Sequence, residues 1–171
     1  MGSRGWKIRR VIAVLAVAVM PALAVAAPAC RDDTVYLRGA WGEARFAVAI
    51  ADTEQERARG LMFVRQMPRG SGMLFVYERP KTARFWMKNT LIPLDILFAD
   101  ASGTIRRIAR MARPMSEALI PGGDGIQYVL EINGGMAKAL GISAGSEMRH
   151  PAIAPEIAAW PCQGADNPAA E

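Results

Sequence analysis

The fold is decided by residues 85–98, which read FWMKNTLIPLDILF. The apolar residues of this stretch predict two β-strands, divided near Pro93, which cannot donate to a strand ladder. Lys88, Asn89 and Asp95 stand inside the apolar run. Burying a charge or an amide without a partner costs several kcal/mol. We therefore expect these three side chains either at an exposed rim or in a satisfied network.

Strand alternation separates the side chains of the first half of this stretch. It sends Trp86, Lys88 and Thr90 to one face and Phe85, Met87 and Asn89 to the other. Phe85 and Met87 make the better core pair, so Trp86 and Lys88 are predicted to be accessible. An accessible indole can stack on a sugar, a ring or a cation. The other interpretation is that Trp86 covers an edge of the core, and the sequence favours neither.

The rest of the chain is predicted to be mostly strand. Apolar runs bounded by glycine, proline and polar turns predict strands at 35–38, 43–50, 73–77, 104–108, 128–132 and 147–149. Residues 78–81 are interpreted as a turn and residues 110–124 as a loop beside the site. The turn at 100–103 predicts a hairpin between the strands on either side of it.

Two short helices are predicted. The residues at 53–56, Thr-Glu-Gln-Glu, form a capping box that starts the first helix. Its apolar stripe, Ala58, Leu61 and Met62, is expected to face the sheet. The second helix is predicted over Met136–Leu140 and ends at Gly141.

The first 26 residues predict export. Four basic residues precede an apolar run over 11–19 and then small residues, which is the pattern of a secretory signal peptide with cleavage after Ala26. The apolar run is too short to span a membrane, and we expect no membrane span later in the chain. The mature protein is expected to be periplasmic or secreted, with one domain over 27–162 and a disordered tail over 163–171.

The charge of the mature chain argues against nucleic acid as a partner. Four of the 21 basic residues and none of the 16 acidic residues lie in the leader, which leaves 17 basic residues against 16 acidic ones. The basic isoelectric point of the full chain therefore does not indicate a nucleic-acid surface. We expect a monomer.

Two cysteines, Cys30 and Cys162, stand near the two ends of the mature chain. An oxidising compartment favours their pairing, which closes a long loop worth roughly 4–5 kcal/mol on the chain-entropy model. The alternative is a lipid anchor at Cys30, but the residues before it lack the leucine of such sites. We expect the disulfide.

Two carboxylates, Asp95 and Glu131, are embedded in apolar strands, where such groups are commonly paired with a cation. Arg84 and Lys88 are the nearest candidates, and Glu131 is expected to be buried and paired with one of them. Carboxylates beside a lysine could perform general acid and base chemistry, but structural ion pairs look the same in a sequence.

Metal and cofactor sites are not indicated. The chain has one histidine, His150, which argues against a histidine-based metal centre or triad. Eight methionines remain after the leader, and those at 62, 73 and 87 sit in apolar runs where methionine is ordinary core filler. No glycine-rich phosphate loop joins a strand to a helix. We expect no cofactor and no metal.

Several motifs together resemble a known family, the domain of unknown function 192, over about residues 35–148. They are Glu54 with Gly60-Leu61-Met62, Gly72-Met73-Leu74-Phe75, Phe85-Trp86-Met87-Lys88-Asn89-Thr90, Pro93-Leu94-Asp95, Val129-Leu130-Glu131, Gly134, Gly141 and Gly145. The chain departs from the family pattern at Gly135 and Ser146. The resemblance implies a mainly β fold, either a compact two-sheet sandwich or a flattened barrel, with one or two short helices. It implies no activity.

The functional expectation is non-catalytic binding of a small or polymeric cell-envelope ligand, such as a small molecule or a glycan, at the surface of Trp86, Lys88 and Asn89. The full set of candidate ligand-binding residues is Arg84, Trp86, Lys88, Asn89, Thr90, Asp95 and Glu131. One alternative is a carboxylate-dependent hydrolase or lyase that uses Asp95, Glu131 and Lys88. A second alternative is a protein-interaction module of the periplasm.

Overall fold

The computed structural model describes residues 30–162 of the 171-residue chain. The predicted leader, its cleavage site and the predicted disordered tail therefore lie outside the described residues. The elements in chain order are β1 (Thr34–Gly39), β2 (Gly42–Ala51), α1 (Glu54–Arg59), β3 (Ser71–Phe85), β4 (Leu94–Asp100), β5 (Ile105–Ala112), β6 (Ile120–Asn133), α2 (Met136–Leu140) and β7 (Glu147–Arg149). Both predicted helices and all the predicted strands except the one over 85–90 are present.

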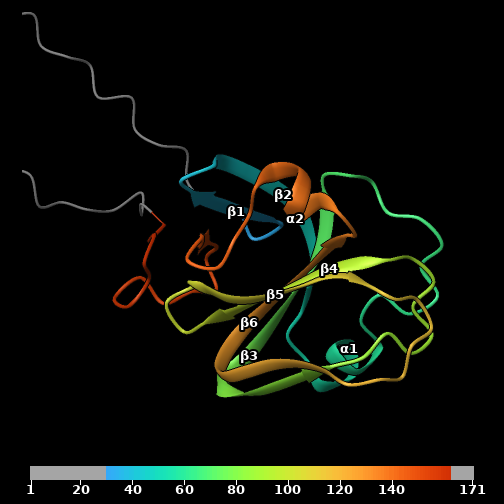
Figure 1. Ribbon diagram of the computed structural model, residues 1–171. Helices are drawn as coiled ribbons and strands as arrows, with labels where there is room; N and C mark the ends of the chain where they lie inside the picture. Colours follow the sequence, from blue (N-terminus) through green and yellow to red (C-terminus); the bar gives the residue numbers. More distant parts are fainter. Residues whose placement is uncertain (1–29, 163–171) are drawn as a thin grey trace, which may run out of the picture.

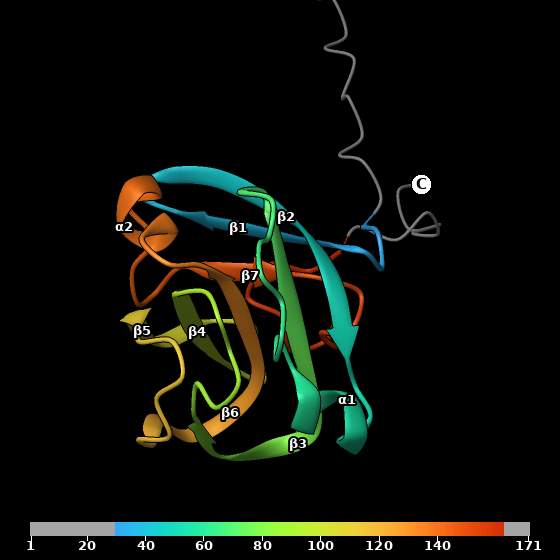
Figure 2. The ribbon, with the colours of Figure 1, turned by 90° about the vertical axis from the view of Figure 1, so that its right-hand side faces the viewer.

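All seven strands belong to one sheet, in the order β5-β4-β6-β3-β2-β1-β7. Neighbouring strands are antiparallel except β2 and β3, which are parallel. The sheet curls until its two ends approach, and an isolated bridge joins Thr104 to Glu147 (Figure 1, Figure 2). The mainly β prediction is confirmed, as a curled half-barrel with two short helices.

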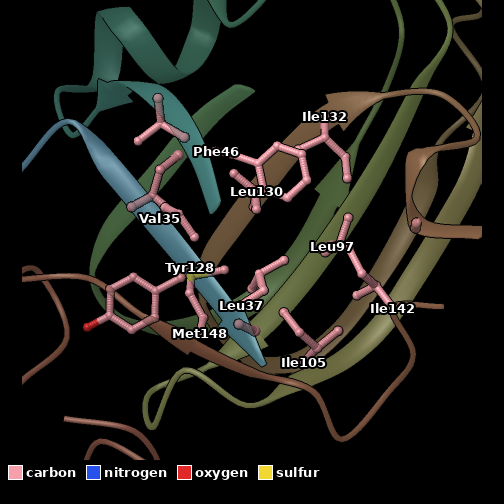
Figure 3. Close-up of a cluster of buried hydrophobic side chains, with 14 of the residues drawn as sticks. Val35, Leu37, Phe46, Leu97, Ile105, Tyr128, Leu130, Ile132, Ile142 and Met148 are labelled. Atoms are coloured by element: carbon pink, nitrogen blue, oxygen red, sulfur yellow. The ribbon is translucent and has the colours of Figure 1, made fainter. Parts of the chain in front are cut away.

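Curling the sheet encloses apolar side chains in two buried clusters. The first gathers Val35, Leu37, Phe46, Leu97, Ile105, Tyr128, Leu130 and Ile132, with others, between the two ends of the sheet (Figure 3). The second, which includes Phe75, Ile96, Phe98 and Val129, lies on the other face of β4 and β6. Because the two clusters cover both faces of β4 and β6, side chains that point to either face are buried in the part of these strands where they pair. Asp95 of β4 and Glu131 of β6 are therefore taken out of water.

The two helices lie at opposite ends of the molecule (Figure 1, Figure 2). The capping box of α1 is present, since Thr53 accepts from the backbone of Glu56 and Glu56 accepts from that of Thr53. The predicted apolar stripe of α1 is wrong, because the helix ends at Gly60, whose φ of 48° favours glycine. No residue of α1 is buried, and the buried Leu61 lies in the turn after it.

Residues 78–81, which are predicted to be a turn, are strand, and so are both ends of the loop predicted over 110–124. Residues 78–81 continue β3 past its register shifts instead of turning, and the loop predicted over 110–124 shrinks to 113–119. Gly122 lies inside β6, where a Cβ atom would come within 2.4 Å of the Phe98 ring. The glycine permits close packing there rather than marking a loop.

The predicted disulfide between Cys30 and Cys162 is present, with a Cα–Cα distance of 5.6 Å. It fastens the last described segment to the start of β1. Two guanidinium groups lie close to the ring of Trp160 in that segment, that of Arg38 at 4.6 Å and that of Arg149 at 4.1 Å. The bridge and these contacts cover the β7 end of the sheet.

Candidate functional site

The predicted strand over residues 85–90 is wrong beyond Phe85, where β3 ends. The chain turns instead: the Met87 amide donates to the Ser116 carbonyl, the Thr90 amide donates to the Met87 carbonyl, and Asn89 has a left-handed φ of 55°. Asparagine tolerates this backbone better than most residues. The predicted exposure nevertheless holds, since Trp86 is 45% exposed and Met87 is fully buried.

A cavity of about 90 Å³ opens beside this turn, between α1 and the end of β3. Its lining includes five of the predicted site residues, Arg84, Trp86, Lys88, Thr90 and Glu131. A water needs roughly 10–15 Å³ of such a cavity. The space therefore holds several waters or the end group of a small organic molecule, but not a whole sugar chain.

Glu131 reaches this cavity from β6 and is only 5% exposed. The predicted ion pair with Lys88 or Arg84 is wrong, because no basic nitrogen lies within 4 Å of the Glu131 carboxyl among residues 30–162. The described residues also contribute no hydrogen bond to that carboxyl. Burial without a partner raises the pKa of Glu131 to about 8. At neutral pH Glu131 is therefore mainly a protonated, neutral acid.

Asp95 is fully buried, but it lies on the other face of the sheet. The pairing of β4 with β6 sets Asp95 opposite Ile132 and Ile96 opposite Glu131, and successive side chains of a strand point to opposite faces. The Asp95 carboxylate accepts at 2.8 Å from the amides of Met111 and of Ala137, the latter in the first turn of α2. Asp95 therefore supports the start of α2, and the structure does not bring it together with Glu131 and Lys88, as the catalytic alternative requires.

The cations around the cavity differ in how they are held. Arg57 donates to the carbonyls of Asp52 and Val76, and its guanidinium lies 5.1 Å from the Tyr77 ring. The Lys88 ammonium lies 5.2 Å from the Trp86 ring and 4.0 Å from an oxygen of the exposed Glu117. Arg84 is exposed and makes no ion pair within the described part of the chain.

Residues 37–150 match the family model of the domain of unknown function 192, DUF192, described as "Uncharacterized ACR". This match covers two thirds of the chain and includes every cavity residue named above. The chain belongs to the DUF192 family. The description of the family assigns no activity, and no curated protein matches the chain.

Two solved structures are similar to this DUF192 chain. A protein of unknown function from Novosphingobium aromaticivorans is 38% identical, with a TM-score of 0.66, and the match covers 72% of this chain and 93% of that one. A protein from Sinorhizobium meliloti, described as a candidate transcription regulator, is 40% identical, with a TM-score of 0.67, and the match covers 71% and 95%. Both are compact β proteins that share the fold.

In this DUF192 domain Asn89 supports the cavity instead of lining it. Its side-chain amide donates to the sulfur of Met62 at 3.9 Å, and its backbone carbonyl accepts from the backbone amide of Phe63 at 2.8 Å. Met62 belongs to the cavity wall. Thr90 lines the cavity but is buried, and its carbonyl accepts from the Met115 amide at 3.0 Å. These bonds hold the flanking loops in place around the opening.

An apolar rim surrounds the turn. Its exposed side chains are Trp86 and Leu91 of this segment, together with Phe63 and Met115, whose amides donate to the carbonyls of Asn89 and Thr90. Phe63, Met111 and Met115 have φ angles of 65°, 52° and 62°, a left-handed backbone that bulky residues seldom adopt. Such local strain is concentrated at ligand and switch sites of proteins.

Sequence reasoning missed Arg57 and Tyr77. Arg57 lies outside the apolar stripe predicted for its helix, and Tyr77 is the last residue of the strand predicted over 73–77. Strand alternation could have found Tyr77, since it follows Phe75 on the same face of β3. Burial raises the pKa of the Tyr77 hydroxyl, Arg57 opposes the shift, and Glu131 adds to it.

Within residues 30–162 we find no group of three or more metal-ligating side chains and no helix that is long and apolar enough to cross a membrane.

Proposed function

We propose that this DUF192 protein is exported and binds a small envelope ligand, or the end group of an envelope polymer, in the cavity between Trp86, Lys88 and Glu131. The observation that carries the proposal is the buried, unpaired carboxyl of Glu131 at a cavity open to solvent. Burial of this carboxyl disfavours its ionised form, which lowers the stability of the fold at neutral pH. Proteins keep such costly groups mainly where function needs them.

The walls of the cavity support binding. Phe75 and Phe85 are in edge-to-face contact with ring centroids 5.1 Å apart, and Tyr77 and Trp86 complete an aromatic wall. Charged side chains from several elements also line the cavity beside these rings, and ligand sites commonly combine apolar walls with polar groups that orient the ligand. The apolar rim extends the contact surface outward, so a ligand larger than the cavity would rest on it.

A binding experiment on the mature protein tests this function. Protein purified from the periplasm is mixed with the small-molecule fraction of a cell-envelope extract, and retained compounds are read by native mass spectrometry. We expect one retained mass that is lost in Trp86→Ala and kept in the control Ile157→Ala, which removes a similarly exposed apolar side chain from the C-terminal segment. Equal retention by both variants, or no retained compound at all, would refute the proposal.

A second candidate function is general acid catalysis by Glu131, with Lys88 as its partner, in a hydrolase or lyase. The observation that favours it is the pKa of Glu131 near 8, because a general acid must carry its proton at the working pH. Chemical conversion of the retained compound, abolished in Glu131→Gln, would distinguish the enzyme from the binding protein.

A further inference from the structure

The cavity wall carries four basic residues, Arg57, Arg59, Arg84 and Lys88, and one acidic residue, Glu131. Arg57 is fixed by two backbone carbonyls. Arg59 and Arg84 make no ion pair within residues 30–162, and Lys88 has only a 4.0 Å contact with Glu117. The donors that can turn to a ligand thus include those of Arg84 and of Lys88 on the turn.

We propose that the ligand presents an acidic end group, a carboxylate or a similar small oxyanion, between Arg84, Lys88 and the carboxyl of Glu131. This inference rests on the binding function above and specifies its ligand class. Arg84 is near the end of β3, Lys88 is in the turn after β3, and Glu131 is in β6, and all three line the cavity. The three elements bring two cations and one acid to a space that fits a group of a few atoms.

The role of Glu131 in this arrangement is that of a hydrogen-bond donor. Because the buried carboxyl holds its proton at neutral pH, its O–H can donate to an oxygen of the ligand. A hydrogen bond from a neutral acid to an anion is charge-assisted and about twice as strong as a bond between neutral groups. Arg84 and Lys88 supply the opposite charge, and Trp86 covers the apolar part of the ligand.

The rival ligand class is an amine, whose ammonium group would form an ion pair with an ionised Glu131. An ammonium group would have to pass Arg84 and Lys88 at the opening, where like charges repel it. It would also have to remove the Glu131 proton before forming an ion pair. Both effects favour the anion over the cation.

Benzoate, benzamide and benzamidine form a planar series with one ring and an end group that is negative, neutral or positive. Their binding to the disulfide-bonded mature protein can be followed by chemical-shift changes of the Trp86 indole N–H, assigned with Trp86→Phe. We expect benzoate to bind with a Kd on the order of 1 mM and at least about tenfold more tightly than the other two, which corresponds to about 1.4 kcal/mol.

Matched variants distinguish the roles of the three groups. We expect Arg84→Ala and Lys88→Ala each to weaken benzoate binding by about fivefold or more, while Lys138→Ala on the exposed face of α2 leaves it unchanged. Glu131→Gln keeps a neutral donor of the same shape and should retain benzoate binding within about threefold.

Preferential binding of benzamidine that is lost in Glu131→Gln would overturn the anionic class and leave the binding function standing. Equal binding of benzoate and benzamide would also overturn it, since charge would then not contribute. Failure of all three compounds to shift the indole signal would overturn the inference at this cavity, whereas the proposed function has its own test in the envelope extract.

Discussion

Replacing Glu131 by glutamine should stabilise the protein at neutral pH. The substitution keeps the size and shape of the side chain and removes its ionisation. In the folded protein the pKa of Glu131 is raised from 4.5 to about 8, so between these values the folded carboxyl is protonated while the unfolded one is ionised. The folded state then binds more protons, and the free energy of unfolding falls as pH rises, by about 1.4 kcal/mol per pH unit.

The magnitude follows from that interval. Between pH 4.5 and about pH 8 the free energy of unfolding falls by roughly 4–5 kcal/mol in total. Roughly 3 kcal/mol of this decrease has occurred by pH 7. Glutamine carries no such pH dependence. We therefore expect the two proteins to have nearly equal stability at pH 4 and the variant to be more stable by roughly 3 kcal/mol at pH 7.

Urea unfolding of the disulfide-bonded protein, followed by circular dichroism at fixed ionic strength from pH 4 to pH 9, measures this difference. Glu156→Gln makes the same chemical change at an exposed carboxyl and should alter stability by less than about 0.5 kcal/mol throughout. Parallel curves for Glu131→Gln and the wild type would refute the reasoning. A variant that is less stable at pH 7 would mean that Glu131 is ionised and paired, as the sequence alone suggested.

Removing the disulfide with the double substitution Cys30→Ser and Cys162→Ser should lower the free energy of unfolding by about 2–4 kcal/mol, and an unchanged urea midpoint would contradict this. Asp95→Asn should cost about 2–4 kcal/mol, because it loses charge-assisted bonds from the Met111 and Ala137 amides. Where the variant still folds, ligand retention should be that of the wild type, and selective loss of the ligand would return Asp95 to the site. Thermal unfolding should not respond to chelator, and a large drop in midpoint would reveal a metal site.

Local sequence patterns predicted the parts of this protein that depend on near neighbours. The capping box at Thr53, the hairpin turn at 100–103 and the short helix before Gly141 all form as predicted, because each is stabilised by contacts within a few residues. The family motifs predicted the mainly β fold. The residue types around Trp86 and Lys88 also indicated the region of the cavity.

Pairing between distant strands decided what local patterns could not. Residues 78–81 look like a turn, but β6 lies alongside and the strand continues. Residues 86–90 look like a strand, but amides of the loops at 63 and 115 bond to the carbonyls of Asn89 and Thr90 and hold a turn. In both places long-range hydrogen bonds override local propensity.

The same long-range pairing decided the candidate site. Asp95 and Glu131 are equivalent in the sequence, as lone acids in apolar strands, yet the register of β4 on β6 sends them to opposite faces. A shift of β4 by one residue along β6 would place both carboxyls on the same face. The sequence by itself thus determined which side chains are chemically unusual, and only the tertiary structure decided that Glu131 shares a cavity with Trp86 and Lys88 while Asp95 supports α2, because strand register is set by contacts far apart in the chain.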